Sequence, residues 1–258
     1  MYASNYLEQT FLNCFNGTGA TAPQNLYLRL FSSNPTDTGL AGTEISYTGY
    51  QPQEITFSAP ENYSSGLAIA NASQIEFAIA GEDVGNITHI GIFDSSTGGN
   101  MLVYGELNEV LNIKQGESPI FLAGEIKFYN TGNLSTYYKR VFLNFLRNTN
   151  LPAITPYFSL FSGNPESGGV ELTGDNYSRP SITFSAPYDT ATGVMQIKNS
   201  AQIEFNRASS NWGNSDYRCI FDASSSGQCV WFKQATLRDF NTGRKYIISA
   251  ENLLVGVN

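Results

Sequence analysis

The sequence predicts an all-β protein built of two tandem β-sandwich domains, each preceded by a short amphipathic helix. Three observations carry this prediction: an internal repeat, short strand-like segments separated by turn signals, and an aromatic content of 13%. Short strands at regular spacing with turns between them are typical of sandwiches. A chain of 258 residues suits two domains of ordinary size. We therefore place the domains at residues 1–130 and 131–258, called below the first and second repeat.

The internal repeat is the strongest signal in the chain. Four blocks return in the same order about 127–130 residues later, and the copies begin at Leu30 and Leu160, Ile55 and Ile182, Gln74 and Gln202, and Ile92 and Ile220. The longest block, Ile55–Pro60, is repeated without a change as Ile182–Pro187. The seam lies near the polar segment 129–133. If the repeats are independent domains, cutting the chain at Gly132 gives two soluble fragments that each melt cooperatively.

Each repeat opens with a segment that has helical periodicity. In the first, Leu7, Phe11, Cys14 and Phe15 share one face, and Asn5 followed by Glu8 resembles a capping box. In the second, the apolar face includes Tyr138, Val141, Phe142, Phe145 and Leu146, and Ser135 or Thr136 is the expected cap. Each apolar stripe must be covered, either by its own domain or by a neighbouring subunit.

The rest of each repeat is predicted to form β-strands. In the first repeat we predict strands at Leu26–Phe31, Ile55–Phe57, Ile75–Phe77, Thr88–Phe93, Met101–Tyr104 and Ile120–Leu122. Asp94 and Asp222 each follow a strand and begin a turn, where an aspartate accepts hydrogen bonds from backbone N–H groups.

Composition argues against several classes of partner. The net charge is −8, charged residues make up only 14% of the chain, and basic residues do not cluster, so we expect no nucleic-acid binding. No signal peptide and no apolar run of membrane-spanning length is evident, so we expect synthesis in a cytosol and no membrane contact. Three cysteines in such a protein are expected as free thiols, although Cys219 and Cys229 flank a predicted hairpin turn and could face each other.

The chemistry of catalysis is missing from the pattern. There is no nucleophile elbow, phosphate loop or zinc signature, and the single histidine, His89, has Tyr217 at the matching place in the second repeat. A glycan-cleaving enzyme would need two acids in a groove. The repeated Glu76 and Glu204 instead alternate with apolar residues and face away from the core. We predict no enzymatic activity, no cofactor, no metal site and no catalytic residue.

Aromatic residues in loop-like segments are the candidate contact residues. Such rings stack on sugars or pack on partner proteins at a small entropic cost, and edge-of-core packing is the alternative. The residues are Tyr47, Tyr50, Tyr63, Tyr177, Tyr188 and Trp212.

Several of these segments together resemble a known family. The first repeat shows in order Leu28–Phe31, Pro35–Asp37, Glu44, Gly49-Tyr50, Ile55–Phe57, Gly85–Asp94, Gly98–Gly105, Gly116 and Ala123–Glu125. This order resembles tailed-bacteriophage proteins described as tail-fibre-like or minor virion structural proteins. The two repeats match the family unevenly. Where the family has a tryptophan, the first repeat has Val84, whereas the second repeat keeps the tryptophan as Trp212. A family Tyr-Ala-Arg step survives at Tyr177–Arg179 and is lost at Tyr50–Pro52.

The resemblance implies a virion structural protein. We expect it to act by protein–protein assembly with other capsid or tail proteins, as a head decoration or a tail or fibre part, and to form a homo-oligomer. Such a protein is made in the host cytoplasm and resides in the virion. The alternative is a carbohydrate-binding module for host surface glycans, which needs aromatic residues converging on one face.

Overall fold

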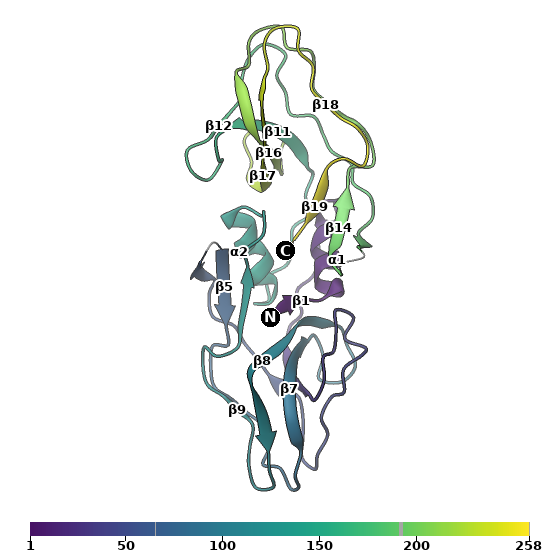
Figure 1. The fold of residues 1–258 in the computed structure, drawn as a ribbon, viewed down its shortest axis with the longest axis vertical. Helices are drawn as coiled ribbons and strands as arrows, with labels where there is room; N and C mark the ends of the chain where they lie inside the picture. Colours follow the sequence, from purple (N-terminus) through teal and green to yellow (C-terminus); the bar gives the residue numbers. More distant parts are fainter. Residues whose placement is uncertain (65, 191–192, 258) are drawn as a thin grey trace.

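The structure is a computed structural model that describes residues 1–64, 66–190 and 193–257. It is mostly β, with 38% of residues in strands and 8% in helices, as the sequence predicts. The molecule is elongated (Figure 1). The paired long strands of the two repeats extend from the middle of the molecule toward opposite ends, and both helices lie in the middle.

The first repeat contains one helix and ten strands among its described residues: β1 (Tyr2–Ala3), α1 (Asn5–Cys14), β2 (Tyr27–Phe31), β3 (Gln53–Glu54), β4 (Glu61–Tyr63), β5 (Gly66–Ala70), β6 (Ile75–Glu76), β7 (Gly85–Phe93), β8 (Met101–Ile113), β9 (Ile120–Phe121) and β10 (Lys127–Asn130). The strands form a five-stranded sheet in the order β1-β8-β7-β2-β3, a three-stranded sheet β10-β5-β4 and a ribbon β6-β9. Every described strand pair is antiparallel.

The second repeat follows the same plan. Its elements are α2 (Thr136–Phe145), β11 (Tyr157–Ser162), β12 (Val170–Glu171), β13 (Tyr188–Asp189), β14 (Met195–Lys198), β15 (Ile203–Glu204), β16 (Asn214–Phe221), β17 (Cys229–Asp239), β18 (Ile247–Ile248) and β19 (Leu254–Gly256). They form the sheets β12-β11-β16-β17 and β13-β14-β19 and the ribbon β15-β18.

Serine side chains cap both helices. The Ser135 hydroxyl accepts a hydrogen bond from the backbone N–H of Tyr138, which confirms one of the two predicted caps. In the first repeat the predicted cap, Asn5, is wrong: Ser4 is the cap and accepts from the N–H of Leu7, while Asn5 is the first helical residue. Both residue types cap well, and the extended backbone at Ser4 decides between them.

Three of the predicted strands differ clearly in extent, and the first of these is β7, which begins at Gly85 and not at Thr88. The strand expected at Met101–Tyr104 continues to Ile113 and forms the long hairpin with β7. The strand expected at Ile55–Phe57 is wrong in its extent, because β3 ends at Glu54 and Phe57 makes only an isolated bridge with Asn71. Here the chain leaves the five-stranded sheet and crosses to the segment that follows β5 in the three-stranded sheet, so a continuous ladder cannot form.

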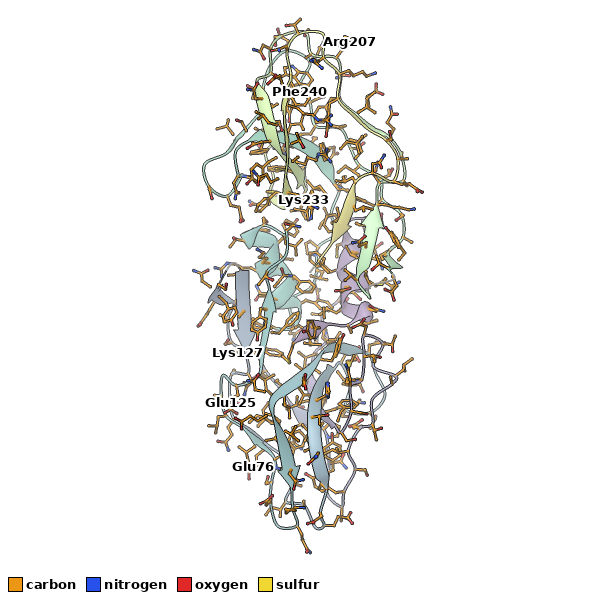
Figure 2. The ribbon with its side chains drawn as sticks, in the orientation of Figure 1. Glu76, Glu125, Lys127, Arg207, Lys233 and Phe240 are labelled. Atoms are coloured by element: carbon orange, nitrogen blue, oxygen red, sulfur yellow. The ribbon has the colours of Figure 1, made fainter. Side chains whose placement is uncertain are left out.

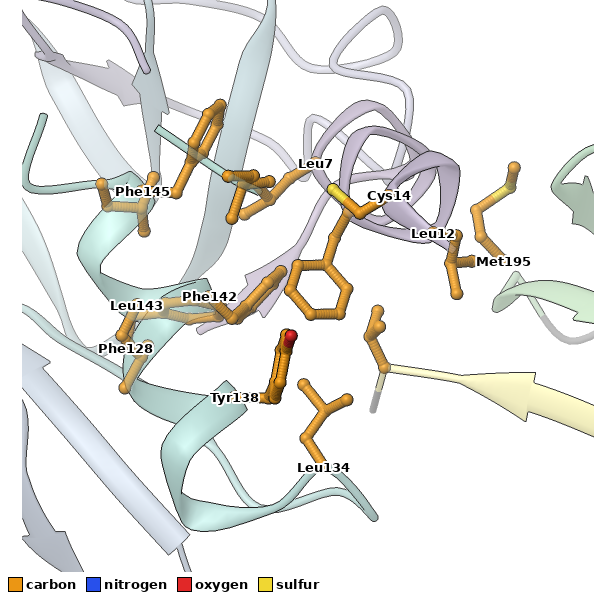
Figure 3. Close-up of a cluster of buried hydrophobic side chains, with 14 of the residues drawn as sticks. Leu7, Leu12, Cys14, Phe128, Leu134, Tyr138, Phe142, Leu143, Phe145 and Met195 are labelled. Carbon is orange, nitrogen blue, oxygen red and sulfur yellow. The ribbon is translucent and has the colours of Figure 1, made fainter. Parts of the chain in front are cut away.

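Each helix is covered by both repeats of the same chain. Helix α1 packs on β8 of its own repeat and on β14 of the second, and α2 packs on β17 of its own repeat and on β5 of the first. Figure 3 shows the apolar faces of the two helices turned toward each other, with Met195 of β14 beside Leu12 of α1. The buried Glu8 carboxylate of α1 accepts a hydrogen bond of 2.8 Å from the N–H of Met195.

The contacts between the repeats join equivalent residues. When the caps Ser4 and Ser135 are aligned, Phe11 corresponds to Phe142 and Ala20 to Leu151. The rings of Phe11 and Phe142 meet edge to face, with centroids 4.9 Å apart. Ala20 and Leu151 exchange backbone hydrogen bonds of 3.1 and 2.9 Å. Contact between like positions marks a two-fold relation, so the chain is arranged as a covalently linked two-fold pair around one continuous core.

The three cysteines are free thiols in the structure. Burial raises the pKa of Cys14 to about 12 and also raises the pKa of Cys219, so neither forms a reactive thiolate near neutral pH. Cys229 is only half-buried. We therefore expect a thiol-specific reagent to label the native protein quickly at Cys229 alone and all three cysteines after unfolding. A Cys229→Ser control should lose the fast phase, and rapid native labelling of Cys14 would contradict this.

Candidate functional site

Two of the predicted contact residues, Tyr47 and Tyr50, lie against the core of the first repeat. Tyr47 is buried, and its hydroxyl donates a hydrogen bond to the carbonyl of Ala78. The Tyr50 ring stacks on Phe77 with an interplanar angle of 3°. These rings present little surface to a partner, and edge-of-core packing describes their position.

Tyr177 and Trp212 occupy the corresponding region of the second repeat. Trp212 is 4% exposed, and its indole N–H donates to the carbonyl of Asp175 over 2.9 Å. Tyr177 meets Trp212 edge to face at 5.2 Å and also lies near Phe205. Trp212 thus fills the second core in the region where the first repeat has the partly buried Val84.

Tyr63 is the exposed residue of the predicted set, and Tyr188 is half-buried. Tyr63 ends β4, is 45% exposed and stacks on Tyr129 of β10 at 4.7 Å. Tyr188 begins β13 and has the Lys198 ammonium 5.6 Å from its ring centre. The structure does not bring the six aromatic residues together on one face, and a contact role for Tyr63 and Tyr188 stays a prediction.

The repeated glutamates form structural networks. In the second repeat, Arg179 donates to both oxygens of Glu171, at 2.8 and 2.6 Å. The Arg179 guanidinium also donates to two carbonyls of the β16–β17 turn and lies 3.8 Å above the Phe221 ring. Tyr177 donates its hydroxyl hydrogen to Glu171. This network holds the hairpin turn against the sheet edge.

The first repeat builds the same network with an arginine from a different strand. Pro52 stands where the second repeat has Arg179, but Arg29 of β2 reaches the same place. Its guanidinium lies 3.6 Å from Glu44, donates to the carbonyls of Ser95 and Gly98, and sits 4.0 Å above the Phe93 ring. The sequence pattern misses this replacement, because Arg29 aligns with Ser159 and not with Arg179.

This replacement leads to a test within one chain. Arg29→Ser should lower the free energy of unfolding by about 2 kcal/mol, since it removes the cation beside Glu44 and leaves two turn carbonyls without their guanidinium donor. Adding Pro52→Arg should recover part of that loss by supplying a guanidinium from the position used in the second repeat. Urea denaturation of both variants measures the change, with Pro52→Arg alone as the control. A double variant no more stable than Arg29→Ser would show that the two positions are not interchangeable.

The turn aspartates act as predicted. Asp94 accepts from the N–H of Asn100, and Asp222 accepts from the N–H of Gln228, both over 2.7 Å. The two acids therefore close equivalent hairpin turns. Glu76 and Glu204 are exposed, and Glu204 forms an ion pair with Lys245.

The two repeats differ strongly in charge. Residues 1–130 hold 13 acidic and 3 basic residues, a net charge of −10, whereas residues 131–258 hold 9 acidic and 11 basic residues, a net charge of +2. The outer end of the first repeat exposes Glu82, Asp83, Glu109 and Glu117, and that of the second exposes Arg207, Arg238, Arg244 and Lys245. Figure 2 shows Arg207 at one extreme of the long axis and Glu76 in the opposite half.

A protein-family model matches the chain twice, over residues 2–129 and 133–256, and is described as podophage GP4 fiber I protein gp80. The chain belongs to this phage fibre family. Each match covers one repeat, so one copy of the model corresponds to one half of the two-fold pair. The resemblance seen in the sequence is therefore confirmed, and the family supports a structural role in a phage virion. No curated protein matches the chain.

Among the residues that the structure describes, neither helix is long and apolar enough to cross a membrane. No group of three or more histidine, cysteine, aspartate or glutamate side chains is placed there to hold a metal ion.

Proposed function

We propose that this chain is a fibre component of a phage particle that acts by assembling with other virion proteins and not as an enzyme. The observation that carries the proposal is that two fibre-family units, residues 1–130 and 131–258, are fused into one body with a common core. Within such a body the two units keep a fixed relative position, which suits a spacer or connector between partners.

Because the two ends of the molecule carry opposite charge, we expect each end to bind a different partner protein. An acidic end attracts basic surfaces and the other end attracts acidic ones, which sets orientation during assembly. A single unit paired with an identical copy would present two identical ends. We also expect the whole chain to form a homo-oligomer in the particle, made in the host cytoplasm and carried in the virion.

Immunoelectron microscopy of purified particles tests this proposal. We expect an antibody against this chain to label the tail region, and label spread over the head would instead indicate a decoration protein. An immunoblot of denatured particles is the control for buried epitopes. Absence of the chain from that blot would contradict a virion role altogether.

A second candidate function is recognition of host glycans. It is favoured by the exposed Tyr63 stacked on Tyr129, because an aromatic ledge offers a flat apolar surface to a sugar ring. A Tyr63→Ala variant that assembles normally but lowers adsorption of phage to host cells would support it. Unchanged adsorption by that variant would argue against this ledge.

A further inference from the structure

A cavity of about 490 Å³ lies in the second repeat, between the β16–β17 hairpin and the segment leading into β19. Its lining includes Arg218, Trp231, Lys233, Gln234, Thr236 and Asn252. Figure 2 places Lys233 toward the middle of the molecule, far from Arg207 at the outer end. The volume is in the range of sites that bind small molecules.

Two cations face each other in this cavity. Arg218 of β16 and Lys233 of β17 are direct cross-strand partners, so their side chains project from the same face of the sheet. Neither forms an ion pair with any residue in the described part of the chain. Like charges in this register repel each other, and an anion bound between them would remove that repulsion.

The surroundings leave the arginine without an acceptor. The Arg218 Nε–H is buried and has no hydrogen-bond partner among the described residues. Glu251, the acid beside Asn252 in sequence, is held by Lys198 at 3.0 Å. A guanidinium is a planar set of donors that matches a carboxylate, so the cavity has donors prepared for one.

The first repeat has no such cavity lining. Ile90 and Gly105 are the cross-strand pair where the second repeat has Arg218 and Lys233. Met1 fills the space above this pair, because a Cβ placed on Gly105 would lie 2.8 Å from the Met1 Cγ. Counting back from the caps Ser4 and Ser135, the counterpart of Met1 is Gly132, which has no side chain to fill the same space. The second repeat therefore lacks the apolar plug of the first and has two cations at the same place.

We propose that this cavity binds a carboxylate-bearing sugar, such as a uronic or sialic acid residue of a surface polysaccharide. Arg218 and Lys233 bind the carboxylate, and Thr236 and Asn252, which also line the cavity, supply hydrogen bonds to hydroxyl groups. The inference deepens the second candidate function, and its choice of host polysaccharide as the source rests on that function.

Binding to the purified full-length chain tests the site without any virus particle. Calorimetric titrations would compare glucuronic acid and N-acetylneuraminic acid with neutral methyl glucoside and with inorganic phosphate. We expect at least one acidic sugar to bind and the neutral sugar not to bind. Phosphate binding as tightly as either sugar would overturn the assignment to a sugar, because it would show a site for any small anion.

Three variants locate the binding. Arg218→Ile installs the residue of the first repeat, Lys233→Gln removes one charge, and Gly132→Met restores the plug without changing any charge. Each should weaken binding at least about tenfold, as expected for losing a hydrogen bond to a charged group or the space for the ligand. Lys127→Gln, which removes an exposed strand lysine of the first repeat, is the matched control and should bind as the parent does.

Thermal melts separate binding from folding. Gly132→Met and Lys233→Gln change rim or linker positions, so they should keep the parent melting temperature and remain informative if Arg218→Ile unfolds. Folded variants that bind acidic sugar as tightly as the parent would overturn the proposal, as would a parent chain that binds neither acidic sugar. Neither result would bear on assembly into the virion, which the labelling of particles tests separately.

Discussion

Replacing Phe142 by alanine should lower the free energy of unfolding by about 3–5 kcal/mol and unfold both repeats in a single transition. The Phe142 side chain is 1% exposed and meets Phe11 of the first repeat and Phe128 of β10. Truncation leaves a cavity at the two-fold contact, where neither repeat can close it alone. Phe142 belongs to the second repeat, yet its side chain also stabilises the first.

Urea denaturation with hydrogen exchange measures both parts of this prediction. The amides of β7–β8 and of β16–β17 should lose protection to a similar degree in the Phe142→Ala variant. Leu40→Ala is the control, because Leu40 is 88% exposed and its truncation should change stability by no more than about 0.5 kcal/mol. If the amides of β16–β17 lose protection from hydrogen exchange in this variant while those of β7–β8 keep it fully, the repeats unfold separately.

The common core also changes what cutting the chain should do. Separated at Gly132, residues 1–130 would expose the face of α1 that packs on β14, and residues 131–258 would expose the face of α2 that packs on β5. We expect each half alone to aggregate and the two halves expressed together to form a soluble complex. Two soluble halves that melt cooperatively by themselves would mean that each repeat is an independent domain.

The duplication was readable from sequence, but the way its copies meet was not. Repeated blocks show that two segments share a fold, and the periodicity of α1 and α2 shows that each has an apolar stripe. Nothing in a single repeat says which surface covers that stripe. The pairing of Phe11 with Phe142 depends on the geometry of both repeats together, so only the folded chain shows it.

The predicted contact residues show a similar limit. Tyr47 and Trp212 stand beside turn residues in the sequence, yet each reaches back into the core and hydrogen-bonds to a carbonyl there. An aromatic ring near a loop can turn either way, and local pattern does not decide which. The arginine networks could not be predicted for a different reason. Arg29 and Arg179 form equivalent ion pairs, but they stand at positions that do not align between the repeats.

Covalent linkage explains how the repeats could diverge. Two separate units must meet at a concentration set by the cell, whereas joined units meet at a high effective concentration. Identical ends are then no longer required, since each repeat is encoded separately. The net charges of −10 and +2, and the exchange of Ile90 and Gly105 for Arg218 and Lys233, are differences that a pair of identical chains cannot have.

Replacing Arg179 by methionine should cost about 3 kcal/mol at neutral pH, because it leaves Glu171 partly buried without its cation. The Arg179 side chain is 7% exposed and its guanidinium lies 2.6 Å from Glu171. Lys114→Met is the matched control: it breaks the Lys114–Asp83 pair, whose side chains are both exposed, so it should change stability much less than Arg179→Met does. Equal losses in the two variants, measured by urea denaturation, would contradict a special role for the buried pair.

The pH dependence of that difference identifies its cause. Burial by itself raises the pKa of Glu171, but the hydrogen bonds and charge of Arg179, together with Tyr177, outweigh it and hold the pKa below the ordinary glutamate value. A lowered folded-state pKa gives stability that is fully present above the unfolded-state pKa and is lost as the pH falls through the folded-state value. Without Arg179, burial raises the pKa of Glu171, so acid should destabilise the variant less than the parent. The gap in unfolding free energy between parent and Arg179→Met should therefore narrow as the pH is lowered below the ordinary glutamate range. A gap that stays constant would assign the loss to packing of the arginine on Phe221 and not to its charge.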